Sequence, residues 1–364
     1  MGGSYSTKAV LAPMLAAMLA SLISCAKLAP PQPPDNVVDT TSHAFKWQVD
    51  TIGAEGSYLF DVCLINDTLA YAVGKIYPRD SAGSSDLGHP CNAAVWNGHQ
   101  WTMIRVPYYY QGQPSYGTIY SICGTSGDDI WFGFGNIVHW DGTSYSLPQV
   151  FPSFQSPANK MWESPDGNTL FVVGENGLIA YFNGNTSQVI KTSTSLPFQD
   201  VWGATTSNGQ EQVLAIASDK FGLGGKYIIS LSGSSYTQLL DSVGQAVSVS
   251  SIWFVPNQKY YLVGDGIFEK SALANSIWQL DPFTNQITGY PYAVRGNGID
   301  DVVVVGELGV VAHYNGLTWY KYVELQNSMD RLTSVSIRGN EIIAVGGRYY
   351  DGLHNYGLIT HGRR

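Results

Sequence analysis

The chain has 364 residues, of which 13% are charged, 13% are aromatic and 40 are glycine, and its formal net charge is −9. An acidic chain without a run of like charges lacks the basic face of a nucleic-acid-binding protein, so we expect no nucleic-acid partner. Few charges together with many glycines, tyrosines, tryptophans and valines are typical of an all-β protein with short strands.

The N-terminal segment reads as an export signal. Lys8 precedes an apolar run that is too short to span a bilayer, and a small residue then precedes Cys25. This ending resembles the bacterial lipobox, which implies a lipoprotein signal peptide over residues 1–24 and a lipid on Cys25. Residues 25–43 then form the lipidated cysteine and a Pro-rich tether. An ordinary secretory signal and a retained membrane anchor are the alternatives.

Lipidation predicts a protein anchored in the bacterial cell envelope, at the outer membrane or cell surface, facing the periplasm or the exterior. Three further cysteines, Cys63, Cys91 and Cys123, allow at most one internal disulfide in that oxidising compartment.

From residue 44 onward the chain repeats a unit of four predicted strands, A to D, at a spacing of roughly 34 to 50 residues, which is the period of propeller blades. Strand B ends in Val-Gly, and an Asn-Gly or Asp-Gly turn joins strands C and D, as at residues 96–98, 140–142 and 314–316. Such turns tolerate positive φ and close tight hairpins. Strand A occurs seven times, with these residues in equivalent positions: Cys63, Cys123, Trp162, Trp202, Trp253, Arg295 and Ser336.

The two ends of the repeat region complement each other. The seventh repeat begins at Leu332 and stops before its strand D, whereas residues 43–50 look like a strand D without a blade. The sequence therefore predicts an all-β fold, a seven-bladed β-propeller over residues 44–364 whose last blade is closed by the N-terminal strand. An open β-sandwich with repeated hairpins is the alternative.

The repeats resemble those of bacterial secreted propellers of the Asp-box (BNR) and photosystem II assembly-factor-like kinds, and some kelch-like repeats. The match to the Asp-box is partial, because residues 314–319 keep only its Gly-x-Thr-Trp half. The resemblance covers nearly all of residues 44–364. It implies the propeller fold and carries over no catalytic residue.

Loops B–C and D–A of a propeller gather on one face, which is where ligands commonly bind. Three of them, 75–91, 107–116 and 347–356, are longer than a turn requires, and closure of the ring should bring them side by side. Their aromatic and charged side chains suit a sugar or a peptide, and the alternative is that they only pack their own loops. The candidate ligand-binding residues are Tyr77, Arg79, Asp80, His89, Tyr108, Tyr109, Tyr110, Arg348, Tyr349, Tyr350, Asp351 and His354.

No nucleophile, phosphate-loop, calcium-loop or zinc-type motif is present in the sequence, so we expect no metal and no cofactor. The equivalent strand A residues are expected to pack blade on blade, with a role in lining the channel as the alternative. The predicted function is a non-enzymatic binding or scaffold propeller, anchored to the membrane by its lipid, for an envelope protein or a glycan. The alternative is a carbohydrate-active enzyme, a glycosyl hydrolase or lyase, with its site on the same face.

Overall fold

The computed structural model describes residues 40–110, 113–146, 156–219, 225–239, 246, 248–274, 277–350 and 354–364, except for the side chain of Tyr110. They belong to one compact unit, Asp39–Arg364. Cys25, the predicted signal peptide and the tether up to residue 39 lie outside the described residues, so the lipobox stays a prediction.

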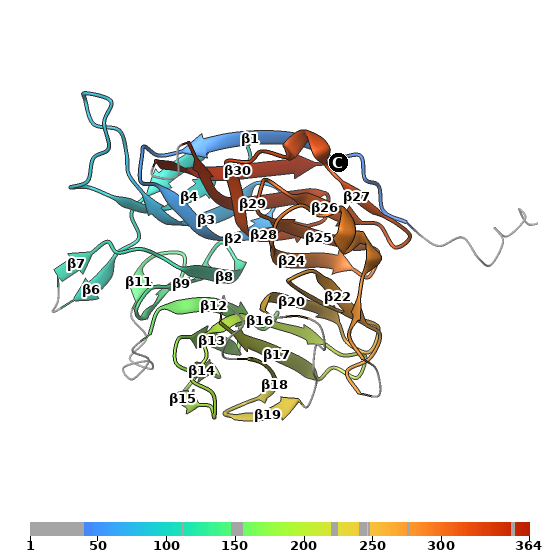
Figure 1. Cartoon of the computed structure of the whole chain (residues 1–364). Coiled ribbons are helices and arrows are strands. Elements are labelled where there is room, and N and C mark those ends of the chain that lie inside the picture. Colours follow the sequence, from blue (N-terminus) through green and yellow to red (C-terminus); the bar gives the residue numbers. More distant parts are fainter. Residues whose placement is uncertain are drawn as a thin grey trace, which may run out of the picture. The chain divides into compact units, whose positions relative to one another are not determined.

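The main strands form seven four-stranded antiparallel sheets, the blades of a propeller, as the sequence predicts (Figure 1). Blades one to three are β2 (Tyr58–Asn66), β3 (Leu69–Ile76), β4 (Cys91–Trp96) and β5 (Trp101–Ile104); β8 (Ser121–Ser126), β9 (Asp129–Gly133), β10 (Ile137–Trp140) and β11 (Tyr145–Ser146); and β12 (Ala158–Glu163), β13 (Leu170–Gly174), β14 (Leu178–Phe182) and β15 (Ser187–Lys191).

Blades four to six continue in the same order. They are β16 (Phe198–Thr205), β17 (Glu211–Ser218), β18 (Lys226–Ser232) and β19 (Ser235–Leu239); β20 (Val249–Val255), β21 (Lys259–Gly264), β22 (Ile267–Lys270) and β23 (Gln279–Leu280); and β24 (Pro291–Gly298), β25 (Asp301–Gly306), β26 (Val311–Tyr314) and β27 (Trp319–Lys321). Two short 3-10 helices, η1 (Pro282–Gln286) and η2 (Val323–Leu325), and a small hairpin, β6 (Tyr108–Tyr110) with β7 (Gln113–Ser115), lie between blades.

The seventh blade joins both ends of the repeat region. Its strands are β28 (Asp330–Arg338), β29 (Glu341–Tyr349), β30 (Asn355–Arg363) and, outermost, β1 (Lys46–Ile52), which pairs antiparallel with β30 from Lys46↔Arg363 to Ile52↔Gly357. The predicted closure by the N-terminal strand is therefore confirmed. Just before β1, His43 Nδ1 lies 2.8 Å from Nδ1 of the buried His313 in blade six, which ties the strand to the neighbouring blade as well.

The turns have the local chemistry that the sequence predicts. In the turn between β10 and β11, the Asp141 carboxylate accepts the backbone N–H groups of Thr143 and Ser144, each at 2.8 Å. Gly142 follows with φ +87°, a backbone conformation that glycine adopts without a steric clash because it has no Cβ. An aspartate and a glycine in sequence thus satisfy the backbone of a tight hairpin.

Seven innermost strands contact one another in a closed circle (Figure 1), and we call the region around the axis of this circle the central channel: β2, β8, β12, β16, β20, β24 and β28. We call the side with the loops between second and third strands, such as 77–90 and 307–310, the B–C face. The opposite side, with turns such as 67–68 and 127–128, is the A–B face. Each innermost strand runs from the B–C face to the A–B face.

Candidate functional site

A β-bulge recurs near the B–C end of six of the seven innermost strands. Each bulge leaves one residue without a partner on the second strand and reorients its side chain. Tyr120, directly before β8, occupies the corresponding place in blade two. These half-buried residues line one cavity of about 700 Å³ at the B–C mouth of the channel: Phe60, Tyr120, Asn159, Gln199, Ser250, Tyr292 and Thr333. Every blade therefore contributes at least one side chain to this cavity, which we call the central cavity.

Aromatic rings form part of the wall of the central cavity. The rings of Phe60 and Tyr120 lie 5.4 Å apart between centroids, and those of Tyr290 and Tyr292 lie 5.0 Å apart. The Tyr292 hydroxyl donates to Glu307 Oε1 at 3.0 Å. These rings give the cavity apolar faces beside a fixed polar group.

Two amide side chains add polar groups to the same cavity. Asn159 Nδ2 donates to the carbonyl oxygen of Phe198 in the next blade at 3.0 Å, and Gln199 Nε2 donates to the Ser218 carbonyl oxygen at 2.7 Å. These bonds hold the amides in place. Their own amide oxygens accept no hydrogen bond from a described residue, so the cavity offers two acceptors to a ligand.

Deeper in the channel, Asp200 on β16 is buried and fully hydrogen-bonded. It accepts the backbone N–H groups of Val201 and Ile252 at 2.9 and 3.0 Å, and the Ser251 hydroxyl at 2.6 Å. Both terminal nitrogens of Arg295 donate to it at 2.8 and 2.9 Å. Burial alone would raise the pKa of Asp200, but the charge and hydrogen bonds of Arg295 outweigh it and lower the pKa below its ordinary value.

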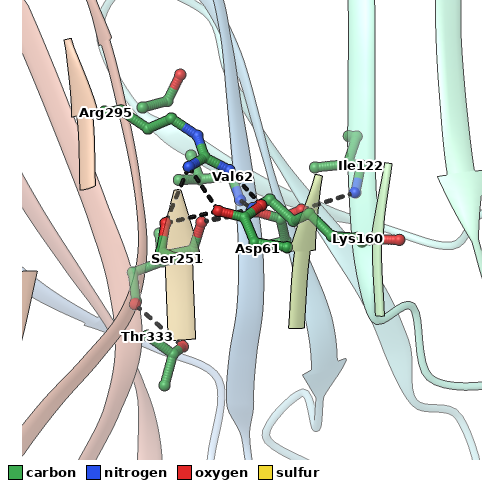
Figure 2. A network of polar contacts seen from close by, with 12 residues as sticks. Asp61, Val62, Ile122, Lys160, Ser251, Arg295 and Thr333 are labelled. Atoms are coloured by element: carbon green, nitrogen blue, oxygen red, sulfur yellow. Dashed lines mark hydrogen bonds and ion pairs between the residues drawn. The ribbon is translucent and has the colours of Figure 1, made fainter. Parts of the chain in front are cut away.

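Asp61 on β2 is a second buried carboxylate that accepts hydrogen bonds, in its case from the other blades (Figure 2). Its carboxylate accepts the backbone N–H groups of Val62 and Ile122 at 2.9 and 3.0 Å. The Ser334 hydroxyl donates at 2.6 Å and the Lys160 ammonium at 2.5 Å. One carboxylate thereby joins blades seven, one, two and three.

The two carboxylate clusters together form a polar belt across the channel, which consists of Asp61, Lys160, Asp200, Ser251, Arg295 and Ser334. All seven innermost strands donate to one carboxylate or the other. The free space at this level is only about 70 Å³. The belt therefore separates the central cavity from the A–B end of the channel.

Cys63 and its counterparts, the equivalent residues identified in the sequence, lie further along the innermost strands toward the A–B face. The Trp162 ring lies against Gly203 of the next blade and the Trp253 ring against Gly296, so closely that a Cβ on either glycine would clash. The expected blade-on-blade packing is thus present for these tryptophans. Most of the equivalent residues also line the channel, which was the alternative expectation. Six of them line a cavity of about 380 Å³ on the A–B face: Cys63, Cys123, Trp162, Trp202, Arg295 and Ser336.

Cys63, Cys91 and Cys123 are free thiols. Burial, followed by the charge of Asp61, raises the pKa of Cys63 to about 12, and burial also raises the pKa values of Cys91 and Cys123. A thiol that does not ionise is a poor nucleophile. Within the described part of the chain, no group of three or more His, Cys, Asp or Glu side chains is placed to hold a metal ion. The same residues contain no helix with the length and apolarity of a membrane span.

The candidate residues of loop 75–91 are mostly engaged within that loop. Asp80 accepts two backbone N–H groups of its own turn, at 2.8 and 2.9 Å, and Arg79 donates to the Gly83 carbonyl oxygen at 3.0 Å. His89 pairs with Asp86 at 3.0 Å while its side chain stays 74% exposed. All three side chains are exposed, but Arg79 and Asp80 are tied to the backbone of their own loop and His89 is paired with its neighbour Asp86.

Loops 75–91 and 347–356 meet at the segment 53–57, which links β1 to β2. The Tyr77 carbonyl oxygen accepts the N–H of Ala54 at 2.6 Å, and His354 pairs with Glu55 at 3.2 Å. Closure of the ring therefore brings these two loops together, as expected. Asp351 lies outside the described residues.

The remaining candidates of blade seven lie at or just after the end of β29 on the B–C face. Arg348 is held by two hydrogen bonds to Asp330, at 2.6 and 2.7 Å. Tyr349 and the exposed Tyr350 line a cavity of about 630 Å³ that shares Glu307 with the central cavity. These two tyrosines thus extend the surface around the central cavity.

The third loop lies in a different environment. Tyr108 packs on Phe134 in the core of blade two, with ring centroids 5.3 Å apart, so at this residue the alternative of loop packing is what the structure shows. Tyr109 is 43% exposed on the β6–β7 hairpin, and the side chain of Tyr110 lies outside the described part of the chain. Loops 75–91 and 347–356 are therefore linked through segment 53–57, whereas Tyr108 ties the third loop to Phe134 of blade two.

Sequence reasoning missed the central cavity and the polar belt. The belt had a signal, because Asp61 and Asp200 are each the one charged residue of a largely apolar strand. A bulge has no comparable signature, since it depends on the register between two strands.

No protein-family model and no curated protein matches this sequence. Solved structures do match it. YCF48 bound to a D1 peptide has a TM-score of 0.61 at 13% identity, covering 87% of this chain and 97% of that chain. YCF48 from Cyanidioschyzon merolae has a TM-score of 0.56 at 12% identity, covering 87% and 98%. The WD40 β-propeller domain of Doa1 has a TM-score of 0.57 at 14% identity, covering 88% and 97%.

Identities this low show a common fold and no more. The resemblance to photosystem II assembly-factor-like propellers is supported at that level, while the Asp-box and kelch-like resemblances and the secreted lipoprotein character stay predictions. The chain is thus a seven-bladed β-propeller similar in fold to YCF48 and to the Doa1 propeller.

Proposed function

We propose that this chain is a non-enzymatic binding propeller of the bacterial cell envelope, which holds a segment of a protein partner on its B–C face. The observation that carries this proposal is the central cavity of about 700 Å³, to which each blade contributes at least one half-buried side chain. Its volume is within the range of about 300 to 1,000 Å³ that is typical of ligand pockets.

The chemistry of the wall suits a peptide. The free amide oxygens of Asn159 and Gln199 are acceptors for peptide N–H groups. The rings of Phe60 and Tyr292 offer apolar surface to a side chain of the partner. The polar belt beneath leaves little free space, so a bound segment would enter and leave by the B–C mouth.

A protein partner is favoured over the glycan that the sequence also suggests. One of the similar structures is YCF48 with a bound D1 peptide, and this chain shares its fold. Glycan hydroxyl groups could donate to the same amide oxygens, so binding to a glycan array is the second outcome to be measured.

Replacing both Phe60 and Tyr292 by alanine should weaken binding of the captured partner by about 30-fold or more, the loss expected from a buried aromatic anchor. The partner is captured from solubilised envelope extract on the immobilised protein and purified. Its affinity is then measured by titration against wild type and variant. The control is Leu317→Ala, a change of a 59% exposed side chain in the turn 315–318 on the opposite face, which should leave the affinity unchanged.

Two other outcomes would show that the partner does not bind in the central cavity. Unchanged affinity of the Phe60→Ala/Tyr292→Ala variant, together with loss of binding when Tyr109, Tyr349 and Tyr350 are changed to alanine, would place binding on the loops and refute the central cavity. If neither set of changes weakens binding, the B–C face is not the binding face.

Anchoring through a lipid on Cys25 is a separate part of the proposal, supported by the lipobox-like end of the N-terminal apolar run. The Cys25→Ser variant should move from the membrane fraction to the soluble fraction when cells are fractionated. Retention of that variant in membranes would show that something other than a lipid on Cys25 holds the protein there.

The alternative of a carbohydrate-active enzyme needs carboxyl groups that can act on a substrate. Glu307 is a carboxylate of the central cavity, and it accepts hydrogen bonds from Tyr292 at 3.0 Å and Arg331 at 3.3 Å. Turnover of a bound glycan, lost on the change Glu307→Gln, would favour this alternative over the binding function.

A further inference from the structure

The cavity on the A–B face is the most distinctive feature that the proposed function leaves unused. It measures about 380 Å³ and lies on the other side of the polar belt from the central cavity. Met161, Trp162 and Trp202 contribute apolar surface to its wall. This volume and lining suit a small molecule rather than a peptide chain.

The charges around this cavity are unevenly arranged. Lys160 and Arg295 line it, whereas their carboxylate partners Asp61 and Asp200 line only the narrow space within the belt. Lys160 donates to Asp61 and Ser334, which leaves one of its three ammonium hydrogens without an acceptor among the described residues. The cavity therefore presents the cationic side of each ion pair.

Arg338 adds a further cation at the rim. Its side chain is exposed, it lines the cavity, and it forms no ion pair with a described residue. A guanidinium without a partner is well suited to bind a carboxylate through two parallel hydrogen bonds.

Glu163 is the one acidic side chain of the lining among the described residues, and it is buried. Its Oε1 accepts the Trp131 indole N–H at 2.8 Å, and its Oε2 has no hydrogen-bond partner. Burial, followed by the charge of Asp129, raises the pKa of Glu163 to about 8. The raised pKa favours the neutral form of this carboxyl group, so Glu163 opposes an anion in the cavity less than an ordinary carboxylate would.

The other titratable groups around Glu163 come from the neighbouring strands and from the turn after β12. Asp129 on β9 is paired with His139 on β10 at 2.7 Å, and Asp166 follows β12 in the turn to β13. The thiols of Cys63 and Cys123 complete the surroundings and are neutral, because burial raises their pKa values. The described lining itself thus carries three cations, Lys160, Arg295 and Arg338, and one acidic group whose raised pKa favours its neutral form.

We propose that the A–B cavity binds a small organic carboxylate with an apolar body, its carboxylate toward Arg338 and Lys160 and its body against Trp162 and Trp202. This site is independent of the proposed partner site, because the polar belt lies between the two cavities. Ligand chemistry follows from the lining: the cations recognise the carboxylate, and the indole rings contact the body.

Titration of the full-length protein with three probes of one shape tests the charge requirement. Phenylacetate should bind with a Kd of roughly 0.1 to 1 mM, as expected for a ligand of this size. Phenylacetamide, which lacks the charge, should bind about tenfold more weakly, and 2-phenylethylamine should not bind. Tighter binding of the amine, or no binding of phenylacetate at millimolar concentration, would overturn the proposal.

Two variants locate the site. Arg338→Gln changes an exposed side chain and should weaken phenylacetate binding about tenfold without lowering the unfolding temperature, since it removes a charge-assisted hydrogen bond. The matched control Arg79→Gln changes an arginine on the B–C face and should leave binding unchanged. Equal affinities for wild type and Arg338→Gln would show that phenylacetate binds elsewhere.

The pH profile tests Glu163 separately. Binding to wild type should fall as the pH rises above about 8, because the ionised Glu163 then repels the ligand. The Glu163→Gln variant keeps a neutral donor and should bind equally at pH values on either side. Identical pH profiles of the two proteins would contradict the assignment of Glu163 to a carboxylate site.

Discussion

Replacing Asp200 by asparagine is expected to lower the free energy of unfolding by about 3 to 5 kcal/mol, measured by urea denaturation at neutral pH. The change leaves the Arg295 guanidinium, whose side chain is only 9% exposed, without its anion in the middle of the channel. A buried charge without a partner keeps its full desolvation cost, which is why the loss is large. Ser251 and the backbone of blade five also lose a charged acceptor.

The double variant Asp200→Asn/Arg295→Met should recover most of that stability, because it removes the unpaired cation together with its partner. The control is Glu269→Gln, which breaks the ion pair with Lys259 at 2.6 Å. The side chains of that pair are 25% and 28% exposed, so the loss should be below about 1 kcal/mol. Equal losses of unfolding free energy for Asp200→Asn and Glu269→Gln would contradict the claim that burial makes the belt ion pair the more important one.

The lowered pKa of Asp200 predicts how the free energy of unfolding changes on acidification. Arg295 lowers the folded-state pKa of Asp200 against the effect of burial, so its stabilisation is present above the ordinary carboxyl pKa. It is lost as the pH falls through the lowered value, because the unfolded chain then binds the proton first. The double variant should therefore lose less stability on acidification than wild type does.

Replacing Phe45 by alanine is expected to lower the free energy of unfolding by about 3 to 5 kcal/mol, the usual cost of removing a buried phenylalanine side chain. Phe45 is 7% exposed and packs in the core between blades six and seven, with its ring 5.4 Å from His313 and 6.3 Å from Tyr322. It therefore anchors the strand that completes the last blade.

Amide hydrogen exchange reports whether that anchor holds β1 in place. In the Phe45→Ala variant, the amides of β1 and of its partner β30 should exchange faster than those of blade three, because the outer pair opens first. The control Val49→Ala changes a 39% exposed side chain in the same strand and should shift stability by no more than about 0.5 kcal/mol. Unchanged exchange in β1 would mean that the strand pairing alone closes the ring.

The sequence was sufficient for the blade count and the closure, because both depend on local patterns. Asn-Gly and Asp-Gly turns, such as the one at Asp141, mark hairpins wherever they occur, and the strand around Trp47 has no partner nearby in the sequence. With six complete repeats and two complementary ends, the last blade reaches four strands only when those ends pair.

Only the tertiary structure decided the two cavities and the belt between them. Asp200 and Arg295 are 95 residues apart, and Asp61 and Lys160 are 99 apart, so no local pattern pairs them. Which side chain of each innermost strand faces the channel depends on a bulge in the register with the next strand. The loops show the same limit, since Asp80 and Arg348 look available in sequence but are engaged by Ser84 and Asp330 once the chain is folded. Repeats and turns are local and can be read from neighbouring residues, whereas a site at the centre of a ring is made by residues that only closure of the ring brings together.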